Sequence, residues 1–351
     1  MSDLETRINQ WFDHLSEMSP DNVEARRDVE LVITKLDDGQ LRVAEIGPSL
    51  VLFRRAVKRS RCAVIHVQTE VVPGLDHLAL AAAGRGVPVV ITAHDPEPLE
   101  GGERARRRQV RRWRAADAVI IHGEGQRELV ERSAPGVPVF VVPVDLPLGG
   151  PPVGRKEARA RLGLEDAPTA LLLGLIRPYK GLDLLAAAWP GVAARAPGAR
   201  LVIAGEPYRC EELDALEKMA GVEIRRGFIA EDDFDSWAAA PEVIVLPYRQ
   251  GAHSGILHRA LAAGTAVLAS PSLAEEVERT GAGLVVPLEV GAWTDALVDA
   301  LSGHPPPAPA RPDGQKTAEA TVAVYRQVIG SRAGGGRGTG RRTRHRGPRA
   351  G

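Results

Sequence analysis

The chain has 351 residues, 44% of them hydrophobic, which is enough to build the cores of two domains. Its two cysteines, Cys62 and Cys210, form no C-x-x-C pair, so a disulfide framework and a cysteine zinc site are excluded. The formal net charge is zero, but residues 331–351 hold seven arginines and no acid, which leaves 38 basic against 45 acidic side chains in residues 1–330.

The start of the sequence, MSDLETRINQWF, lacks the apolar segment of a signal peptide, and no apolar run reaches the ~18 residues of a membrane span. We therefore expect a cytoplasmic protein. The Gly/Arg-rich tail at 331–351 is predicted to be disordered. It has no interleaved aromatic residues for base stacking, so no nucleic-acid partner is expected.

The first half of the chain alternates strand and helix patterns, which predicts a parallel α/β sheet. The expected strands are residues 29–35, 62–67, 87–92, 118–122 and 137–142, and the expected helices are residues 5–18, 48–58, 75–83, 104–114 and 126–132. A Pro/Gly-rich stretch at 145–154 is the predicted linker.

A second α/β series follows the linker. Its expected strands are residues 170–173, 200–204, 223–225, 243–246, 266–269 and 284–286, and its expected helices are residues 182–189, 211–219, 293–301 and 313–329. We predict two Rossmann-like parallel-sheet domains that face a cleft, at 1–147 and 148–312. A helix at 313–330 is expected to pack back toward the first domain, ahead of the tail. Ligand sites in such folds lie beyond the carboxyl ends of strands.

Residues 246–270 predict a strand, a small-residue loop, a helix that stops at Gly264, and a second strand. Ser254 is a good N-cap, and with Gly255 it starts a helix whose first N–H groups can bind a phosphate or diphosphate. The alternative is an ordinary capped crossover helix.

The loop at 174–181 places Arg177 and Lys180 three residues apart after a strand. Two cations can hold a diphosphate there, the arginine through its fork and the lysine as a point charge. Only six of the 45 basic residues are lysines, so a lysine at this position favours function over a solvated helix start.

His94 directly follows an apolar strand and precedes Asp95. It is a candidate general base or polar contact to a reacting group, and the alternative is a loop histidine with structural hydrogen bonds. His66 and Gln68 alternate at the end of the preceding strand, and together with Asp95 they are candidates for an acceptor site. His122 also ends a strand and is interpreted as structural.

Several of these motifs together resemble family 4 (GT4) glycosyltransferases, which have the GT-B fold and use nucleotide-sugars. The motifs are GLIRPYKG at 174–181, LVIAGE at 201–206, LPYR at 246–249, Ser254-Gly255 with Gly264, and, in the first half, VIHVQ at 64–68, VITAHD at 90–95 and DAVIIH at 117–122. The resemblance implies that Arg177 and Lys180 bind the donor diphosphate. It also implies that Ser254 and Gly255 bind the diphosphate through backbone amides, with His253 beside them. By the same resemblance, His94 faces the transferred sugar, and Glu206 and Ile229 lie near the nucleotide.

The sequence departs from the family in two respects. The family often has two glutamates at the positions of Gly251 and Arg259, and the second usually contacts the donor ribose. The usual opening strand is missing before the helix expected at 5–18, so we expect weak activity that an upstream extension of the reading frame restores.

We therefore predict a glycosyltransferase that moves a sugar from a nucleoside-diphosphate sugar to a glycan, lipid-linked or small-molecule hydroxyl, with retention implied by the resemblance. A degenerate, non-catalytic member and a nucleotide-sugar 2-epimerase are the alternatives. No Asp-x-Asp motif is expected near the cleft, because Asp232, Asp233 and Asp235 lie early in a helix predicted after Ile229, where acids are typical of a helix start. No metal or other cofactor is therefore predicted. The basic helix at 104–114 could contact an anionic membrane from the inner face, or form a solvated surface.

Overall fold

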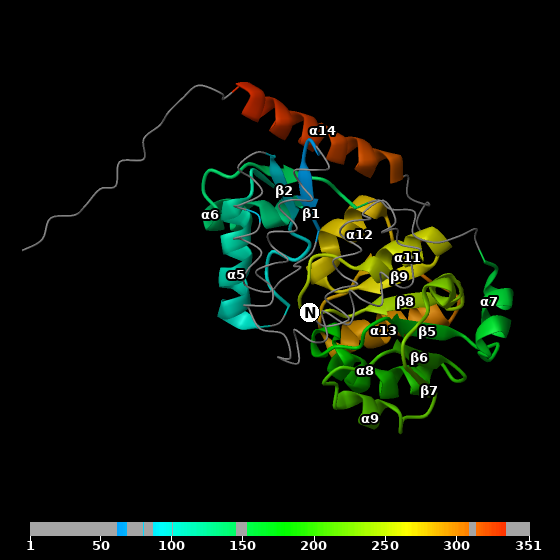
Figure 1. Ribbon diagram of the computed structural model, residues 1–351. Coiled ribbons are helices and arrows are strands. Elements are labelled where there is room, and N and C mark those ends of the chain that lie inside the picture. The colour runs from blue at the N-terminus through cyan, green and yellow to red at the C-terminus, as the bar shows by residue number, and fades with distance from the viewer. Residues whose placement is uncertain are drawn as a thin grey trace, which may run out of the picture. The chain divides into compact units, whose positions relative to one another are not determined.

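The structure is a computed structural model that describes residues 62–68, 80, 87–99, 101–144, 153–308 and 314–334 (Figure 1). The elements expected before residue 62, the helix expected at 75–83 apart from Leu80, most of the predicted linker and the residues after 334 lie outside the described residues. The chain divides into two compact units, which we call unit 1 (1–91, 111–118 and 327–351) and unit 2 (92–110 and 119–326). The predicted domain boundary at 147–148 stays a prediction.

The described first half contains a four-stranded sheet in the order β1-β2-β3-β4. The strands are β1 (Ile65–Val67), β2 (Val89–Thr92), β3 (Ala118–Ile121) and β4 (Val139–Val141). The β1–β2 and β3–β4 pairs are parallel, as the strand and helix alternation predicts. Helix α5 (Gly102–Ala115) follows β2, and helices η2 (Glu124–Gln126) and α6 (Arg127–Ser133) follow β3.

The second half forms a six-stranded sheet in the order β10-β9-β8-β5-β6-β7, in which every pair of neighbours is parallel. The strands are β5 (Thr169–Leu173), β6 (Arg200–Gly205), β7 (Val222–Arg226), β8 (Val243–Leu246), β9 (Ala266–Ala269) and β10 (Leu284–Val285). The helices of this half are α7 (Arg155–Leu162), η3 (Pro178–Lys180), α8 (Leu182–Arg195), α9 (Glu212–Leu216), η4 (Glu231–Asp233), α10 (Phe234–Ala239), α11 (Gly255–Ala263), η5 (Pro271–Leu273), α12 (Ala274–Thr280) and α13 (Val290–Leu301).

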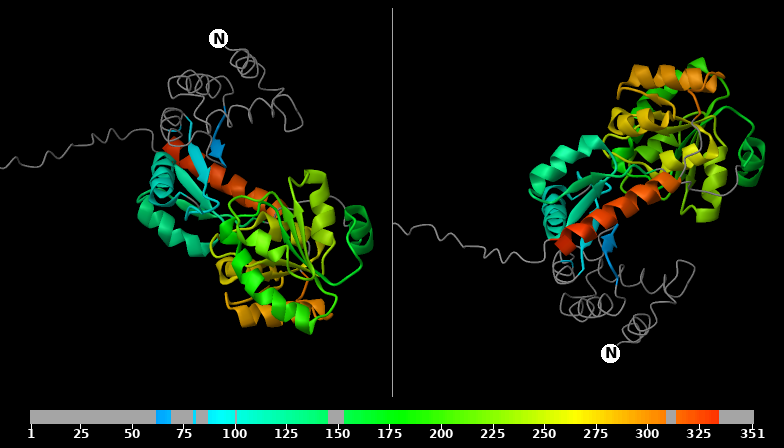
Figure 2. Two further views of the ribbon diagram at one scale, coloured as in Figure 1. Left: turned by 90° about the horizontal axis from the view of Figure 1, so that it is seen from below. Right: turned by 90° about the horizontal axis from the view of Figure 1, so that it is seen from above.

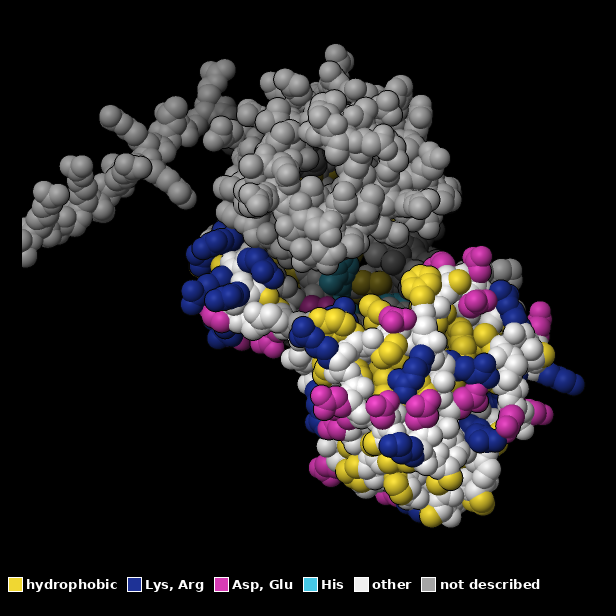
Figure 3. Space-filling model, turned by 60° about the horizontal axis from the view of Figure 1, so that its bottom comes forward, with side chains coloured by type: hydrophobic (Ala, Val, Ile, Leu, Met, Phe, Trp, Pro, Cys, Tyr) yellow, Lys and Arg dark blue, Asp and Glu magenta, His cyan; other side chains and the backbone are white. Residues whose placement is uncertain are grey.

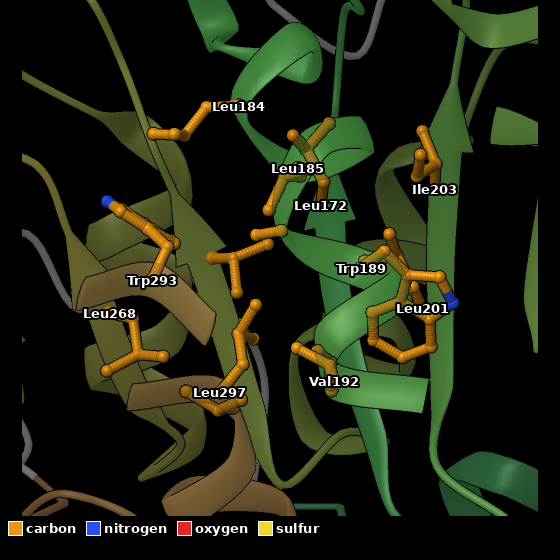
Figure 4. Packing of buried hydrophobic residues seen from close by; sticks show 14 of the residues in the cluster. Leu172, Leu184, Leu185, Trp189, Val192, Leu201, Ile203, Leu268, Trp293 and Leu297 are labelled. Carbon is orange, nitrogen blue, oxygen red and sulfur yellow. The ribbon is translucent and has the colours of Figure 1, made fainter. Parts of the chain in front are cut away.

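Helices cover both faces of the second sheet (Figure 2). Successive residues of each strand point to opposite faces, so Leu172 contributes to one apolar cluster and Leu171 to the other. The first cluster packs α8 and α13 against the sheet through Trp189 and Trp293, both almost fully buried (Figure 4). This two-faced burial explains why the strands are continuous apolar runs rather than alternating patterns.

The last described helix, α14 (Gly314–Gly334), is longer than the sequence predicts, because its described part continues beyond residue 330. Within unit 2, Thr317 donates a hydrogen bond from Oγ1 to the Pro143 carbonyl at 2.9 Å. Within unit 1, the Arg332 guanidinium holds both carboxylate oxygens of Asp117, with Nη2 2.7 and 2.9 Å away.

Two helices of the described structure were not expected, α7 and α12. Both are short, and the exposed side chains of α7 and the three acids of α12 obscure a helical apolar pattern. Among the described residues, none of the helices combines the length and the hydropathy needed to cross a bilayer.

Candidate functional site

The strand order of the second sheet places the candidate site. The chain runs outward from β5 through β6 to β7, then returns to the other side of β5 and continues through β8, β9 and β10. The order therefore reverses between β5 and β8, and ligands in open α/β sheets bind beyond the carboxyl ends of the strands at such a point. The loops that follow these two strands contain the predicted cations and the predicted helix start.

The two loops are held against each other by their backbones. The Arg249 N–H donates to the Tyr179 carbonyl at 2.8 Å. Gly181 ends η3 with a φ of +72°, and a Cβ built there would lie 2.1 Å from the Pro247 carbonyl oxygen. Only glycine satisfies both the left-handed backbone and this approach.

Lys180 is buried beneath the loop rather than solvated, since only 4% of its surface is exposed. Its Nζ donates to the Leu173 carbonyl at the end of β5, 2.8 Å away, and lies 5.5 Å from the centre of the Tyr248 ring. Burial, and next the nearby positive charge of Arg177, lower the pKa of Lys180 to about 7. A buried cation without a carboxylate among these contacts is stabilised by a bound anion.

Arg177 lies at the start of η3 and stacks over the Tyr208 ring, with its guanidinium carbon 5.2 Å from the ring centre. Tyr208 follows β6 and is itself 41% exposed. The aromatic face thus orients the guanidinium, and a guanidinium is a side chain that can bind a diphosphate through two parallel N–H groups.

The start of α11 matches the predicted N-cap. Ser254 Oγ accepts a hydrogen bond from the Leu257 N–H at 3.3 Å, and Gly264 ends the helix at a φ of +68°. The Tyr248 hydroxyl lies 3.3 Å from the same Oγ. The Ser254 N–H is not directed at solvent, because it donates to Glu276 Oε2 at 3.3 Å. Gly255, the first helical residue, is exposed.

Glu276 of α12 is a buried carboxylate that sequence reasoning missed. Its Oε1 lies 2.7 Å from His258 Nε2 and 3.4 Å from His253 Nδ1. Burial by itself would raise the pKa of Glu276, but the hydrogen bonds from the two histidines and their charge lower it to about 2. The site therefore contains a permanent negative charge next to the predicted phosphate-binding helix start.

His94 and His122 lie together in unit 2, at the ends of β2 and β3. His122 Nε2 is 2.9 Å from His94 Nδ1, and His122 Nδ1 is 2.9 Å from the Val142 carbonyl. The His122 ring also meets the His253 ring edge-on, at 4.7 Å between centres. His94 is exposed on its loop, as expected for a group that meets a substrate.

Asp95 and Gln126 link the loop after β2 and the loop after β3 to the loop before α11. Asp95 Oδ1 accepts from the Ala252 N–H at 3.4 Å, and burial raises the pKa of this carboxyl. Gln126 Nε2 lies 3.2 Å from His253 Nε2. The structure thus connects the predicted residues His94, His253 and Ser254 through His122, Gln126 and Glu276. Asp95 joins the same loop through the Ala252 N–H.

Four further predicted residues lie at or after the ends of β6, β7 and β1. Glu206 follows β6 with an exposed side chain, and Ile229 packs against the second apolar cluster. His66 and Gln68 lie at the end of β1, where Gln68 Nε2 is 3.3 Å from the His66 ring. Among the described residues, no group of three or more His, Cys, Asp or Glu side chains is placed to hold a metal ion.

Two family models match the chain. One, described as Glycosyltransferase Family 4, covers residues 16–144, and the other, described as Glycosyl transferases group 1, covers residues 167–303. The chain belongs to the family 4 glycosyltransferases. Its two parallel sheets and helices form the two-part Rossmann-like architecture of the GT-B fold.

Curated relatives match the family 4 chain over part of its length. A GDP-mannose-dependent alpha-(1-6)-phosphatidylinositol monomannoside mannosyltransferase of Mycobacterium tuberculosis is 34% identical over 163 residues, 43% of this chain and 42% of the relative. A D-inositol 3-phosphate glycosyltransferase of Streptomyces avermitilis is 32% identical over 168 residues, 44% of this chain and 35% of the relative. The matches thus span less than half the length of either relative.

Solved structures share the fold at low identity. HepE of Anabaena, in complex with UDP and glucose, superimposes with a TM-score of 0.61 at 17% identity and covers 82% of this chain and 83% of its own. Sucrose-phosphate synthase from Thermosynechococcus elongatus gives a TM-score of 0.56 at 21% identity, with coverages of 84% and 79%.

Arg259 replaces the second glutamate of the family pattern and is integrated into the fold. It forms ion pairs with Glu231 and with Asp235, the latter at 3.4 Å, and its guanidinium lies 4.9 Å from the centre of the Phe234 ring. The first position of the pattern, Gly251, has a φ of +106°, which a glutamate adopts only with strain. Both departures from the family pattern are therefore accommodated in this local structure.

Proposed function

We propose that the chain transfers a sugar from a nucleoside-diphosphate sugar to a hydroxyl group, without a metal ion. The observation that carries this proposal is the pair of cations at the reversal point of the second sheet. Lys180 is buried against the Leu173 carbonyl and the Tyr248 ring, neither of which is a carboxylate, and Arg177 lies in the same loop. A diphosphate supplies the anion that this pair requires.

The reaction breaks the bond between the anomeric carbon and the diphosphate oxygen, and it forms a bond from that carbon to the acceptor oxygen. The electron pair of the broken bond leaves with the nucleoside diphosphate, which gains negative charge. The proton of the acceptor hydroxyl passes to the departing diphosphate or to solvent. Arg177 and Lys180 would stabilise that charge as it develops. His94 would contact the transferred sugar. Retention of the anomeric configuration is our inference from family membership.

The names of the relatives supply the candidate substrates. The Mycobacterium relative is named for GDP-mannose and a phosphatidylinositol mannoside, the Streptomyces relatives for inositol 3-phosphate, and the HepE structure contains UDP. We therefore propose a GDP- or UDP-sugar as donor and an inositol-type or glycan hydroxyl as acceptor.

We also propose that α5 contacts anionic lipid when the acceptor is membrane-bound. Five of its arginines are exposed, Arg104, Arg106, Arg107, Arg111 and Arg114. Lys and Arg side chains gather at the left of Figure 3, where α5 lies. Arg107 is paired with Glu103 at 3.1 Å, so part of this charge is offset within the helix. Co-sedimentation of the full chain with phosphatidylglycerol vesicles, and none with phosphatidylcholine vesicles, would support the contact. Equal sedimentation with both would contradict it.

The function is tested by incubating the full chain with GDP-mannose, UDP-glucose and related donors, with and without inositol phosphates, phosphatidylinositol and glycans. Product mass is measured by mass spectrometry. We expect transfer that survives EDTA, and an Arg177→Ala variant that binds the nucleoside diphosphate roughly 10- to 100-fold more weakly, as for a lost hydrogen bond to a charged group.

Arg195→Ala is the matched control, because this exposed arginine of α8 pairs with Asp295 outside the loops described. It should bind the diphosphate as the wild type does. Activity that EDTA abolishes and magnesium restores would contradict the metal-independent proposal. Failure to bind any nucleoside diphosphate would contradict the donor site itself.

A further inference from the structure

His122 is buried at the end of β3 and is hydrogen-bonded through both ring nitrogens. Only 8% of its surface is exposed. Nδ1 lies 2.9 Å from the Val142 carbonyl, and Nε2 lies 2.9 Å from His94 Nδ1. The two rings are tilted by 42° with their centres 4.8 Å apart, so His94 is held by a fixed partner on one side.

The partners of His122 determine where its proton lies. A carbonyl oxygen only accepts, so His122 Nδ1 must carry the hydrogen and donate it to Val142. Burial lowers the pKa of His122 to about 3, although the hydrogen bond to Val142 acts in the opposite direction, so the ring is neutral at physiological pH. Its Nε2 then carries a lone pair and must accept from His94 Nδ1. In a neutral His94 ring, the nitrogen without a proton is therefore Nε2.

We propose that His122 is a positioning residue that holds the His94 proton on Nδ1, so that His94 Nε2 is the atom that accepts a hydrogen bond from a substrate hydroxyl. The inference rests on the proposed function, because that function assigns His94 to the transferred sugar. An isolated neutral imidazole exchanges between two tautomers, and only one of them presents an acceptor at Nε2. His122 selects that tautomer through a partner that cannot itself become charged near neutral pH.

Two substitutions of nearly equal size separate this role from a purely structural one. In His122→Gln, the longer amide can place its oxygen where Nε2 lies, which keeps an acceptor for His94. In His122→Asn, the shorter amide reaches only the Nδ1 position, so it can still donate to Val142 but has no acceptor for His94. Both variants keep one polar contact in the buried site.

The tautomer is measured by ¹⁵N NMR of the full chain labelled at histidine, with the His94 signals assigned from their loss in His94→Ala. Steady-state kinetics, with the donor that the transfer assay identifies, give kcat and KM. We expect Nδ1–H on His94 in the wild type and in His122→Gln, and an Nε2–H population in His122→Asn. The kcat of the Asn variant should fall by about 10- to 100-fold with an unchanged donor KM, which is less than the roughly 100- to 10,000-fold typical of a lost acid–base group.

Wild-type His94 carrying its proton on Nε2, or Nδ1–H persisting fully in His122→Asn, would overturn the inference. So would a tautomer change in the Asn variant with no change in kcat. Because the NMR measurement requires no turnover, the proposed function and the positioning role of His122 can be contradicted independently of each other. An inactive wild type would overturn the proposed function, and a tautomer change in His122→Asn would still support the positioning role.

Discussion

Replacing Lys180 by methionine should stabilise the free protein and weaken its binding of a nucleoside diphosphate. The pKa of this side chain falls from 10.5 to about 7 because it is buried. At roughly 1.4 kcal/mol per pKa unit, keeping the charged form in this place costs about 4–5 kcal/mol in the absence of an anion. Methionine has a similar length and carries no charge.

The substitution also removes two favourable contacts. The Leu173 carbonyl loses its donor, which costs about 1–3 kcal/mol, and the cation–π contact with Tyr248 is worth roughly 1–2 kcal/mol. We therefore expect a net gain of about 1 kcal/mol in the free energy of unfolding at pH 7. The gain should shrink as pH rises, because an unfolded lysine binds a proton up to pH 10.5 and the folded one only up to about 7.

The substitution should affect nucleoside diphosphate binding in the opposite direction from stability. A diphosphate favours the charged lysine, so the wild type should take up a proton when it binds a nucleoside diphosphate above pH 7, and its affinity should fall by up to about tenfold per pH unit there. Calorimetric titrations in two buffers of different ionisation enthalpy measure this uptake, and thermal unfolding measures stability. Lys180→Met should show no proton uptake from this site.

The exposed Lys218→Met variant is the matched control and should change neither measurement. A Lys180→Met protein that is less stable than the wild type at pH 7, yet binds the diphosphate equally well, would refute the reasoning. That result would mean that Lys180 is a structural residue whose hydrogen bond outweighs the burial of its charge.

Three further predictions concern stability. Gly181→Ala should lower the free energy of unfolding by more than about 2 kcal/mol, because the new Cβ meets a backbone oxygen. Gly163→Ala, which is also at positive φ but has open space around it, should lower it only by the roughly 1–2 kcal/mol of a left-handed residue. Equal losses in urea unfolding would contradict this. Asp117→Ala should lower the free energy of unfolding by about 1–3 kcal/mol, because it removes the ion pair with Arg332 and leaves the Val89 N–H without its acceptor. Arg332→Ala removes only the ion pair and should cost under about 1 kcal/mol. The reverse order would show that the ion pair dominates. Glu276→Gln should remove the part of the wild-type stability that is present above pH 4.5 and lost as pH falls toward 2, and an unchanged acid-unfolding curve would count against it.

The sequence predicted most of the described strands and the unit of β8, α11 and β9, because these depend on local patterns. A buried strand is a short apolar run, and a helix between Ser254 and Gly264 has a cap at each end. The same patterns failed for α12, and with it Glu276 was missed. Glu276 is one of two glutamates in the first turn of this short helix, and no feature of the sequence distinguishes it from a solvated glutamate.

The sequence also determined which loops hold the candidate site residues, because residues that follow parallel strands lie at one edge of a sheet. It could not determine the order of strands within each sheet. That order, set by packing between residues far apart in the chain, places His122 beside His94 across 28 positions and buries Lys180 under the loop after β5. The chemical states of these groups follow from the same contacts. The residue types were thus determined by the sequence, whereas burial and hydrogen-bond partners, which set pKa and tautomer, were decided only when the strands assembled.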